Sequence, residues 1–254
     1  MPNFITSDMA ELSVLVIGGG GREHAICLGL SKSDSVAEIH CAPGNAGTAE
    51  MATNHDISNV SDLVHLAFQL DVDLVVVGPE APLCEGLADK LGNMEIPCFG
   101  PVAGLARLEG SKLHAKQVMQ ANNVPTADFL IIDQATDVDH ALDQYSGNPW
   151  VIKRDVLAGG KGVVVTEDRD EAKEFIQQSI NSDGQVLLEA FLPGNEASML
   201  VVMDGSGFVC LPASQDHKRE FEGDKGRNTG GMGAYAPAPV YTQEVQEKTI
   251  ERIV

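Results

Sequence analysis

The chain has 254 residues, of which 43% are hydrophobic and 21% are charged, and its formal net charge is −20. The length suits two domains, or one domain and part of another, and the apolar fraction is large enough for packed cores. So acidic a chain lacks the basic face that a nucleic-acid-binding protein presents, and we expect no polynucleotide partner.

The cysteines and the apolar runs narrow the class of protein further. The five cysteines are widely spaced and form no CxxC pair, so neither a zinc site nor a disulfide framework is predicted. No apolar run reaches the length of a membrane span, and residues 1–11 lack the basic and long apolar regions of a signal peptide. We therefore expect a cytoplasmic protein with a loose N-terminal extension and no membrane contact.

The first half of the chain, over residues 12–110, alternates apolar runs with helical patterns. This alternation predicts an α/β domain with a doubly wound parallel sheet. The expected strands are 12–17, 36–42, 74–77 and 98–99, and the expected helices are 22–31, 60–70 and 83–91. The strands run into loops rich in Gly or Pro, and in a parallel sheet such loops share the carboxyl edge, where ligands bind.

The glycine run Gly18–Gly21 lies between the first strand and the first helix. Glycines there let backbone N–H groups approach an anion at the helix N-terminus. A dinucleotide fingerprint would need glycine at position 23 or 24, where Glu23 and His24 stand. A structural tight turn is the alternative, but four consecutive glycines cost much chain entropy, so we favour ligand approach. With the loops at 42–48 and 77–83, this run predicts a phosphosugar site.

The second half, from residue 111 onward, reads as a mixed α+β domain. Its expected helices are 111–122 with Ser111 as N-cap, 168–180, and one that begins near Thr242. The expected strands are 129–132, 150–154, 163–166, 186–188 and 197–202. We place a small lid over about 126–194.

Two lysines of this half stand in a pattern suited to phosphate. Lys153 lies on an expected strand, and Lys161 lies in a glycine loop. A Walker A loop is excluded because Gly162 replaces the Ser or Thr that should follow the lysine, and Asp155 replaces the first glycine. A loop that closes over phosphates would have this composition, and a solvated hairpin is the alternative.

The stretches 214–219 and 228–235 bracket a polar, charged loop, which rarely serves packing. His217 alone would more often be structural than catalytic, and the acids Glu189 and Glu196 are weak signals alone. No Ser/His/Asp order and no metal motif of the HExxH type stands out.

Eight segments in one order are together specific, although each is weak alone. They are VIGGGGREHA, APGNAGTA, VGPEAPL, FGP, LEGSK, the Lys153/Lys161 pair, ASQDHKR and NTGGMGAYAPAP. This set resembles the glycinamide ribonucleotide synthetase family of purine-biosynthesis ligases over residues 14–254. The resemblance implies a pre-ATP-grasp domain over 12–110 and an incomplete ATP-grasp domain over 111–254. It also implies ATP-dependent joining of glycine to 5-phosphoribosylamine through a glycyl phosphate, with Mg²⁺ or Mn²⁺ and release of ADP.

The resemblance assigns roles residue by residue. Lys112 and Lys153 would contact the ATP phosphates, and Gly159, Gly160, Lys161 and Gly162 would form the closing loop. The adenine site would be lined by Glu189, Phe191 and Leu192, and Glu196 would hold the ribose hydroxyls. Phosphoribosylamine would be held by Gly18, Gly20, Gly21, Arg22, Gly44, Asn45, Gly47, Gly78, Pro79 and Glu80. The other substrate-binding positions would be Thr229, Gly230, Gly231 and Met232, and the catalytic positions Lys161, Asp216, His217, Lys218 and Asn228.

The chain departs from the family pattern in three places. Arg154 and Val156 stand at the second and fourth positions of the family's K-A-D-G-L-A-A-G-K-G, and Arg227 stands where proline is frequent.

The metal ligands would follow Val254, so we expect no complete reaction from residues 1–254 alone. The alternatives are a sister ATP-grasp ligase for another carboxylate, such as bicarbonate or formate, and a non-catalytic nucleotide-binding module. An NAD-dependent oxidoreductase is a more distant alternative.

Overall fold

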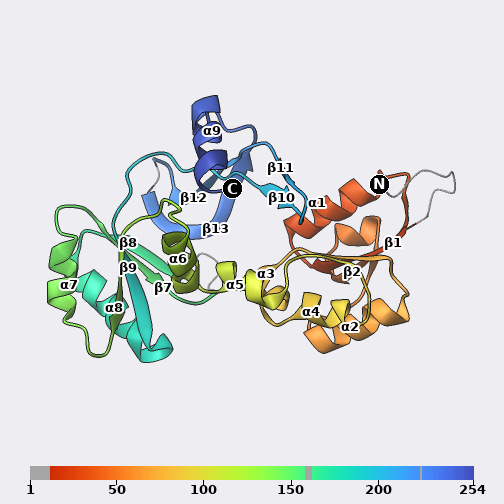
Figure 1. Cartoon of the computed structure of the whole chain (residues 1–254), viewed down its shortest axis with the longest axis horizontal. Coiled ribbons are helices and arrows are strands. Elements are labelled where there is room, and N and C mark those ends of the chain that lie inside the picture. The colour runs from red at the N-terminus through yellow and green to blue at the C-terminus, as the bar shows by residue number, and fades with distance from the viewer. Residues whose placement is uncertain (1–11, 158–161, 224) are drawn as a thin grey trace. The chain divides into compact units, whose positions relative to one another are not determined.

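The computed structural model describes residues 12–157, 162–223 and 225–254, and only the backbone of residues 225, 227 and 228. Contacts divide the chain into an N-terminal unit that ends at Gly110 and a C-terminal unit that begins at Ser111 (Figure 1). None of the helices in the described segments is long and apolar enough to cross a membrane.

The N-terminal unit is built on a five-stranded sheet with the order β3-β2-β1-β4-β5, in which every neighbouring pair is parallel. The strands are β1 (Leu12–Gly18), β2 (Val36–Pro43), β3 (Thr53–Asn54), β4 (Leu74–Val77) and β5 (Cys98–Phe99). The register sets Gly18 beside Pro43 and Ile17 beside Val77. The loops after β1, β2 and β4 therefore leave the sheet at one edge, as the sequence predicted.

Helices cover both faces of this sheet because β1 is apolar on both sides. Leu15 and Ile17 pack into a core with α2 and α4, whereas Val14 and Val16 pack on the other face with Cys27 of α1. The helices are α1 (Gly21–Leu30), α2 (Val60–Gln69), α3 (Glu80–Cys84), α4 (Leu87–Gly92) and α5 (Ala103–Gly110), with a 3₁₀ turn, η1 (Thr48–Glu50). The doubly wound sheet is confirmed.

The single helix predicted over 83–91 is wrong. The structure ends α3 at Cys84 and begins α4 at Leu87, because Gly86 between them has a φ of 85°, in the left-handed region that stops a right-handed helix. The apolar spacing continued across this glycine, so the pattern concealed the break. The short helix α5 was not predicted.

The C-terminal unit contains a four-stranded antiparallel sheet with the order β6-β9-β7-β8. Its strands are β6 (Phe129–Asp133), β7 (Trp150–Arg154), β8 (Val163–Thr166) and β9 (Gln185–Glu189), and its helices are α6 (Lys112–Ala121), α7 (Val138–Gln144) and α8 (Arg169–Asp183). Ile152 and Leu188 of the sheet share a core with Leu142 of α7 and Ile176 of α8. The N-cap predicted for α6 is confirmed, since the Ser111 side chain accepts from the His114 amide.

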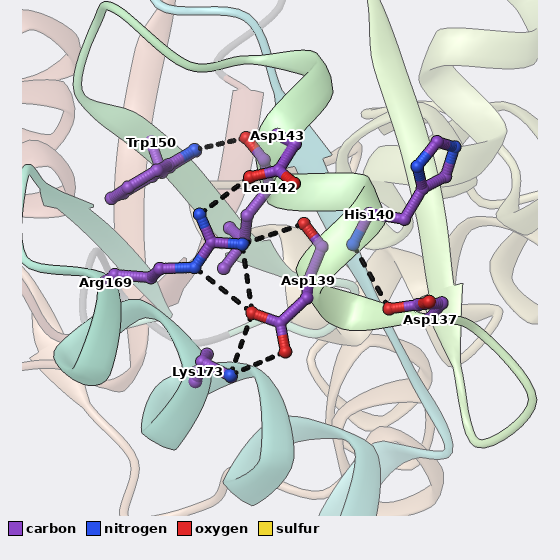
Figure 2. Close-up of polar contacts among 8 residues, drawn as sticks. All are labelled: Asp137, Asp139, His140, Leu142, Asp143, Trp150, Arg169 and Lys173. Carbon is purple, nitrogen blue, oxygen red and sulfur yellow. Dashed lines mark hydrogen bonds and ion pairs between the residues drawn. The ribbon is translucent and has the colours of Figure 1, made fainter.

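Polar contacts also join α7 to α8, as Figure 2 shows. Arg169 donates to the carboxylates of Asp139 and Asp143, and Lys173 donates to Asp139 (Figure 2). Beside them the Trp150 indole donates to the Leu142 carbonyl at 2.9 Å (Figure 2). The ion pairs are exposed and each contributes little, so the shared apolar core holds the two helices together.

The rest of this unit consists of two hairpins and a helix. They are β10 (Val201–Met203) with β11 (Phe208–Cys210), β12 (Gln215–Phe221) with β13 (Lys225–Tyr235), and α9 (Gln243–Arg252). The stretches 214–219 and 228–235, predicted to bracket a polar loop, lie largely on β12 and β13, so that loop shortens to the few residues between Phe221 and Lys225. The pairing of the two stretches as antiparallel strands was not predicted. Backbone groups can form such a ladder without apolar side chains. The sequence therefore showed no apolar alternation that would have indicated these strands. The strand predicted over 197–202 shortens to β10, preceded by an isolated bridge between Ser198 and Ser214.

Candidate functional site

A cavity of about 810 Å³ opens in the C-terminal unit beside strands β7 and β9. This volume is in the range of small-molecule sites, roughly 300–1,000 Å³. Its lining brings together eight of the predicted site residues: Lys153, Glu189, Phe191, Leu192, Glu196, Asp216, His217 and Lys218. Among the described residues, Lys112, Gly162 and the stretch 229–232 are not part of this lining.

Glu189 lines the cavity, and two lysines contact the same oxygen of its carboxylate. Lys116 Nζ lies 2.9 Å and Lys153 Nζ lies 3.0 Å from Glu189 Oε2. The side chains of Lys116 and Glu189 are 9% and 4% exposed, whereas that of Lys153 is 30% exposed. Two cations and one anion leave a local positive charge in a strongly acidic chain, which favours an anionic ligand.

Lys116 was not among the predicted site residues. Its ammonium also donates to Thr126 Oγ1 at 2.8 Å and to the Ala127 carbonyl at 3.0 Å, so it is held entirely within the protein. The sequence did carry a signal, because Lys116 follows Lys112 by four residues and so lies one turn further along the same face of α6.

Lys218 of β12, which also lines the cavity, pairs with Glu196 and lies 3.7 Å from Asp216. Partial burial opposes the charged form of Lys218, but the hydrogen bonds and charges of Glu196 and Asp216 raise its pKa above the ordinary value. The imidazole of His217 lies 5.7 Å from the Tyr235 ring, centroid to centroid. Glu196, which is predicted to bind the ribose hydroxyls, thus contacts Lys218, which is predicted to lie on the acyl-acceptor side.

Residues 154–156, which precede the predicted closing loop, are tied to two helices. Arg154 binds Asp183 at the end of α8 with contacts of 2.6 and 2.8 Å, and Arg154 is the main cause that lowers the Asp183 pKa. Asp155 accepts from the Leu113 amide at 3.0 Å, and Lys112 Nζ donates to the Val156 carbonyl at 3.0 Å. The departure at Arg154 therefore has a structural partner, and the contact of Lys112 with ATP phosphates stays a prediction.

Several predicted site residues lie wholly or partly outside the part of the chain that the structure describes. Gly159, Gly160 and Lys161 lie outside the described residues, as does the side chain of Asn228. Thr229 lies on β13 and its hydroxyl donates to the Lys218 carbonyl at 2.9 Å. Its neighbours Gly230, Gly231 and Met232 follow it on the same strand with exposed surfaces.

In the N-terminal unit, one side chain joins the loops after β1 and β2. Asn45 Nδ2 donates to the carbonyls of Gly19 and Gly20 at 3.0 and 3.1 Å, and Asn45 Oδ1 accepts from the amides of Gly47 and Thr48 at 2.7 and 3.0 Å. Gly44, just before it, has a φ of 73°. Pro79 and Glu80 begin α3 after the third loop. The three loops predicted to bind phosphoribosylamine are therefore neighbours.

The buried carboxylate of Glu23 explains part of the glycine pattern. It accepts from the Gly20 amide at 2.7 Å and from Arg22 Nε at 2.8 Å, and its side chain is 4% exposed. A Cβ on Gly78 would lie 1.9 Å from Glu23 Oε1, and one on Gly18 would lie 2.6 Å from Glu23 Cδ. At these two positions the structural alternative accounts for the glycine. Gly21 is exposed, and an added Cβ would meet nothing within 4 Å.

A metal site would need several His, Cys, Asp or Glu side chains close together. In the part of the chain that the structure describes, no group of three or more His, Cys, Asp or Glu residues is placed to hold an ion. The donor set of the described residues therefore does not fit a divalent cation.

Comparison with known proteins gives a consistent family. A model described as phosphoribosylglycinamide synthetase, N domain, matches residues 12–109, and the ATP-grasp (A) domain of the same synthetase matches residues 110–254. The phosphoribosylamine–glycine ligase of Mycobacterium tuberculosis is 47% identical over 249 residues, which cover 96% of this chain and 59% of the relative. This chain thus spans about 59% of that relative's length.

Two solved structures show the same arrangement of elements. The phosphoribosylamine–glycine ligase of Thermotoga maritima aligns with a TM-score of 0.77 and 34% identity, over 94% of this chain and 59% of that one. The N5-carboxyaminoimidazole synthetase of Staphylococcus aureus, complexed with ADP, aligns with a TM-score of 0.70 and 17% identity, over 95% and 62%. At that identity the second likeness concerns the fold alone.

Proposed function

Because this chain belongs to the phosphoribosylglycinamide synthetase family, we propose that it carries the nucleotide and phosphosugar sites of an ATP-dependent ligase that joins glycine to 5-phosphoribosylamine. The products are glycinamide ribonucleotide, ADP and phosphate. The relatives of M. tuberculosis and T. maritima carry the name of this ligase. The single observation that carries the proposal is the cavity of about 810 Å³, with its net positive lysine pair at Glu189.

ATP binds in this cavity. The Lys153 ammonium faces the phosphates, while Phe191 and Leu192 offer apolar surface to adenine and Glu196 offers a carboxylate to the ribose hydroxyls. A cation close to transferring phosphoryl oxygens stabilises the charge that develops there. ATP phosphorylates the glycine carboxylate, because a free carboxylate is a poor acyl donor and phosphate supplies a leaving group.

The amine of phosphoribosylamine then attacks the glycyl carbonyl carbon, the amide bond forms, and phosphate leaves. Asp216, His217 and Lys218, which line the same cavity as Glu189, serve the acyl acceptor. Acyl phosphates hydrolyse readily, so the site must exclude water while it holds one. Phosphoryl transfer of this kind ordinarily uses Mg²⁺, which neutralises phosphate charge.

Phosphoribosylamine binds at the carboxyl edge of the N-terminal sheet. The order β3-β2-β1-β4-β5 reverses direction between β1 and β4, and such switch points form ligand crevices in open α/β sheets. The loops at Gly18–Gly21, Gly44–Gly47 and Gly78–Glu80 surround this crevice. Arg22, whose side chain is 57% exposed, supplies a cation for the sugar phosphate.

A chimera tests the proposal. Residues 1–254 would replace the matching segment of the M. tuberculosis ligase, and ADP release would be measured with ATP, phosphoribosylamine and glycine. We expect ADP release that depends on glycine and that bicarbonate or formate does not replace. Turnover with either of those carboxylates instead would favour a sister ligase. A folded chimera without turnover, together with no ATP binding by the chain itself, would refute the proposal.

A further inference from the structure

We propose that Lys116 is a positioning residue for nucleotide binding, which neutralises Glu189 and thereby leaves the Lys153 ammonium available to nucleotide phosphates. Lys116 does not line the cavity, so it acts through Glu189 and not by touching the ligand. This inference rests on the proposed function, because it concerns the site in which ATP is placed.

The hydrogen bonds distinguish the two lysines. Lys116 donates hydrogen bonds to Thr126 Oγ1 at 2.8 Å and to the Ala127 carbonyl at 3.0 Å, and its ammonium forms an ion pair with Glu189 Oε2 at 2.9 Å. The ammonium also lies 5.5 Å from the centroid of the Phe129 ring. These polar partners all belong to the protein, and the Lys116 side chain is only 9% exposed and does not line the cavity, so it is not available to a ligand.

Lys153 differs from Lys116 in its free N–H donors and in its exposure. Among the described residues its Nζ contacts only Glu189, at 3.0 Å, so two of its donors remain for a ligand in the cavity that it lines. Its side chain is 30% exposed, against 9% for Lys116. The exposed lysine thus faces the cavity, and the buried one supports the carboxylate behind it.

Charge explains why both lysines are needed. If Lys153 alone faced Glu189, the two would form a neutral pair, and an approaching phosphate would compete with Glu189 for the only cation. With Lys116 present, the buried lysine neutralises the carboxylate of Glu189, and the cluster keeps one positive charge. The value of Lys116 for phosphate binding therefore depends on the negative charge of Glu189.

The dependence on Glu189 gives a test by calorimetry of ATP binding to the chain. The variants are Lys116→Met, Glu189→Gln and their combination, with Lys173→Met as the matched control because Lys173 pairs with Asp139 on an exposed surface. We expect K116M to weaken ATP binding about tenfold, as for a lost charge-assisted contact, and K173M to leave it unchanged. In the Glu189→Gln background, where no charge needs neutralising, K116M should have no further effect.

Each outcome of the calorimetry supports or overturns the role proposed for Lys116. Equal ATP affinity of wild type and K116M overturns the inference and leaves the proposed function standing. An additional tenfold loss from K116M in the E189Q background also overturns it, since Lys116 would then act independently of Glu189. If K116M does not fold, the comparison between E189Q and the combined variant still decides, because the combined variant buries neither the Glu189 carboxylate nor the Lys116 ammonium. If the wild-type chain binds no ATP, the proposed function and this inference fall together.

Discussion

Replacing Gly78 by Ala should destabilise the N-terminal unit, because the buried carboxylate of Glu23 occupies the space that a side chain would need. A Cβ at position 78 would lie 1.9 Å from Glu23 Oε1, far inside van der Waals contact. The carboxylate cannot withdraw freely, because it holds the Gly20 amide at 2.7 Å. Gly78 does not have a positive φ, so the change tests space and not backbone strain.

The magnitude follows from two contributions. Overpacking of a filled site typically costs about 1–3 kcal/mol. Displacing Glu23 would also leave a buried polar group unsatisfied, at about 1–3 kcal/mol, while the exposed bond to Arg22 adds little. We expect a loss of about 3 kcal/mol in the free energy of unfolding of the N-terminal unit. Gly21→Ala is the matched control, because an added Cβ there meets nothing within 4 Å.

Amide hydrogen exchange on the whole chain is the assay. Amides of β1 and β4 should lose protection in Gly78→Ala and keep it in Gly21→Ala, while fluorescence of Trp150, the single tryptophan, reports the C-terminal unit. Adding Glu23→Ala to Gly78→Ala should remove the clash, so the double variant should be no less stable than Glu23→Ala alone. Equal protection in the two glycine variants would refute the reasoning.

Four further predictions concern binding and pH. Lys153→Ala should weaken ATP binding by about 1–3 kcal/mol in calorimetry, and unchanged affinity would count against the nucleotide site. Gly20→Val should abolish binding of ribose 5-phosphate, and a folded variant that still binds it would show that the phosphosugar lies elsewhere. Burial and, to a lesser extent, the charge of His40 lower the pKa of His55 below 6.5. The stability that is present above pH 6.5 should therefore be lost as the pH falls below that value. Urea unfolding at several pH values should show this loss, and His55→Gln should reduce it. The net charge of −20 should prevent micromolar binding to DNA or RNA at low salt, and a fluorescence-anisotropy titration that showed such binding would contradict this.

The N-terminal sheet could be predicted from the sequence because its strands are continuous apolar runs that end in Gly or Pro. The run 12–17 became β1, and 74–77 became β4 without change. The break at Gly86 escaped because a single glycine is compatible with helical spacing. The hairpin of β12 and β13 escaped because its ladder relies on backbone groups, while the side chains of that stretch are polar or absent.

The candidate sites were predictable where a motif marked them and obscure where a contact crosses long sequence distances. Lys153 and Glu189 could each be named, but their meeting on one oxygen depends on the pairing of β7 with β9. Lys116 and Glu23 were missed as supporting residues because burial of a charged group is a property of the fold. Glu23 did stand three residues after Gly20, a spacing at which a glutamate can cap a helix.

The four hydrogen bonds of Asn45 have a consequence for motion at the phosphosugar edge. Two of them hold carbonyls of the loop after β1, and two hold amides of its own loop after β2. A carboxylate would lose both donated bonds, so aspartate cannot take over the role. A ligand that displaces the loop after β1 must therefore either break the two bonds that Asn45 donates or move the loop after β2 with it.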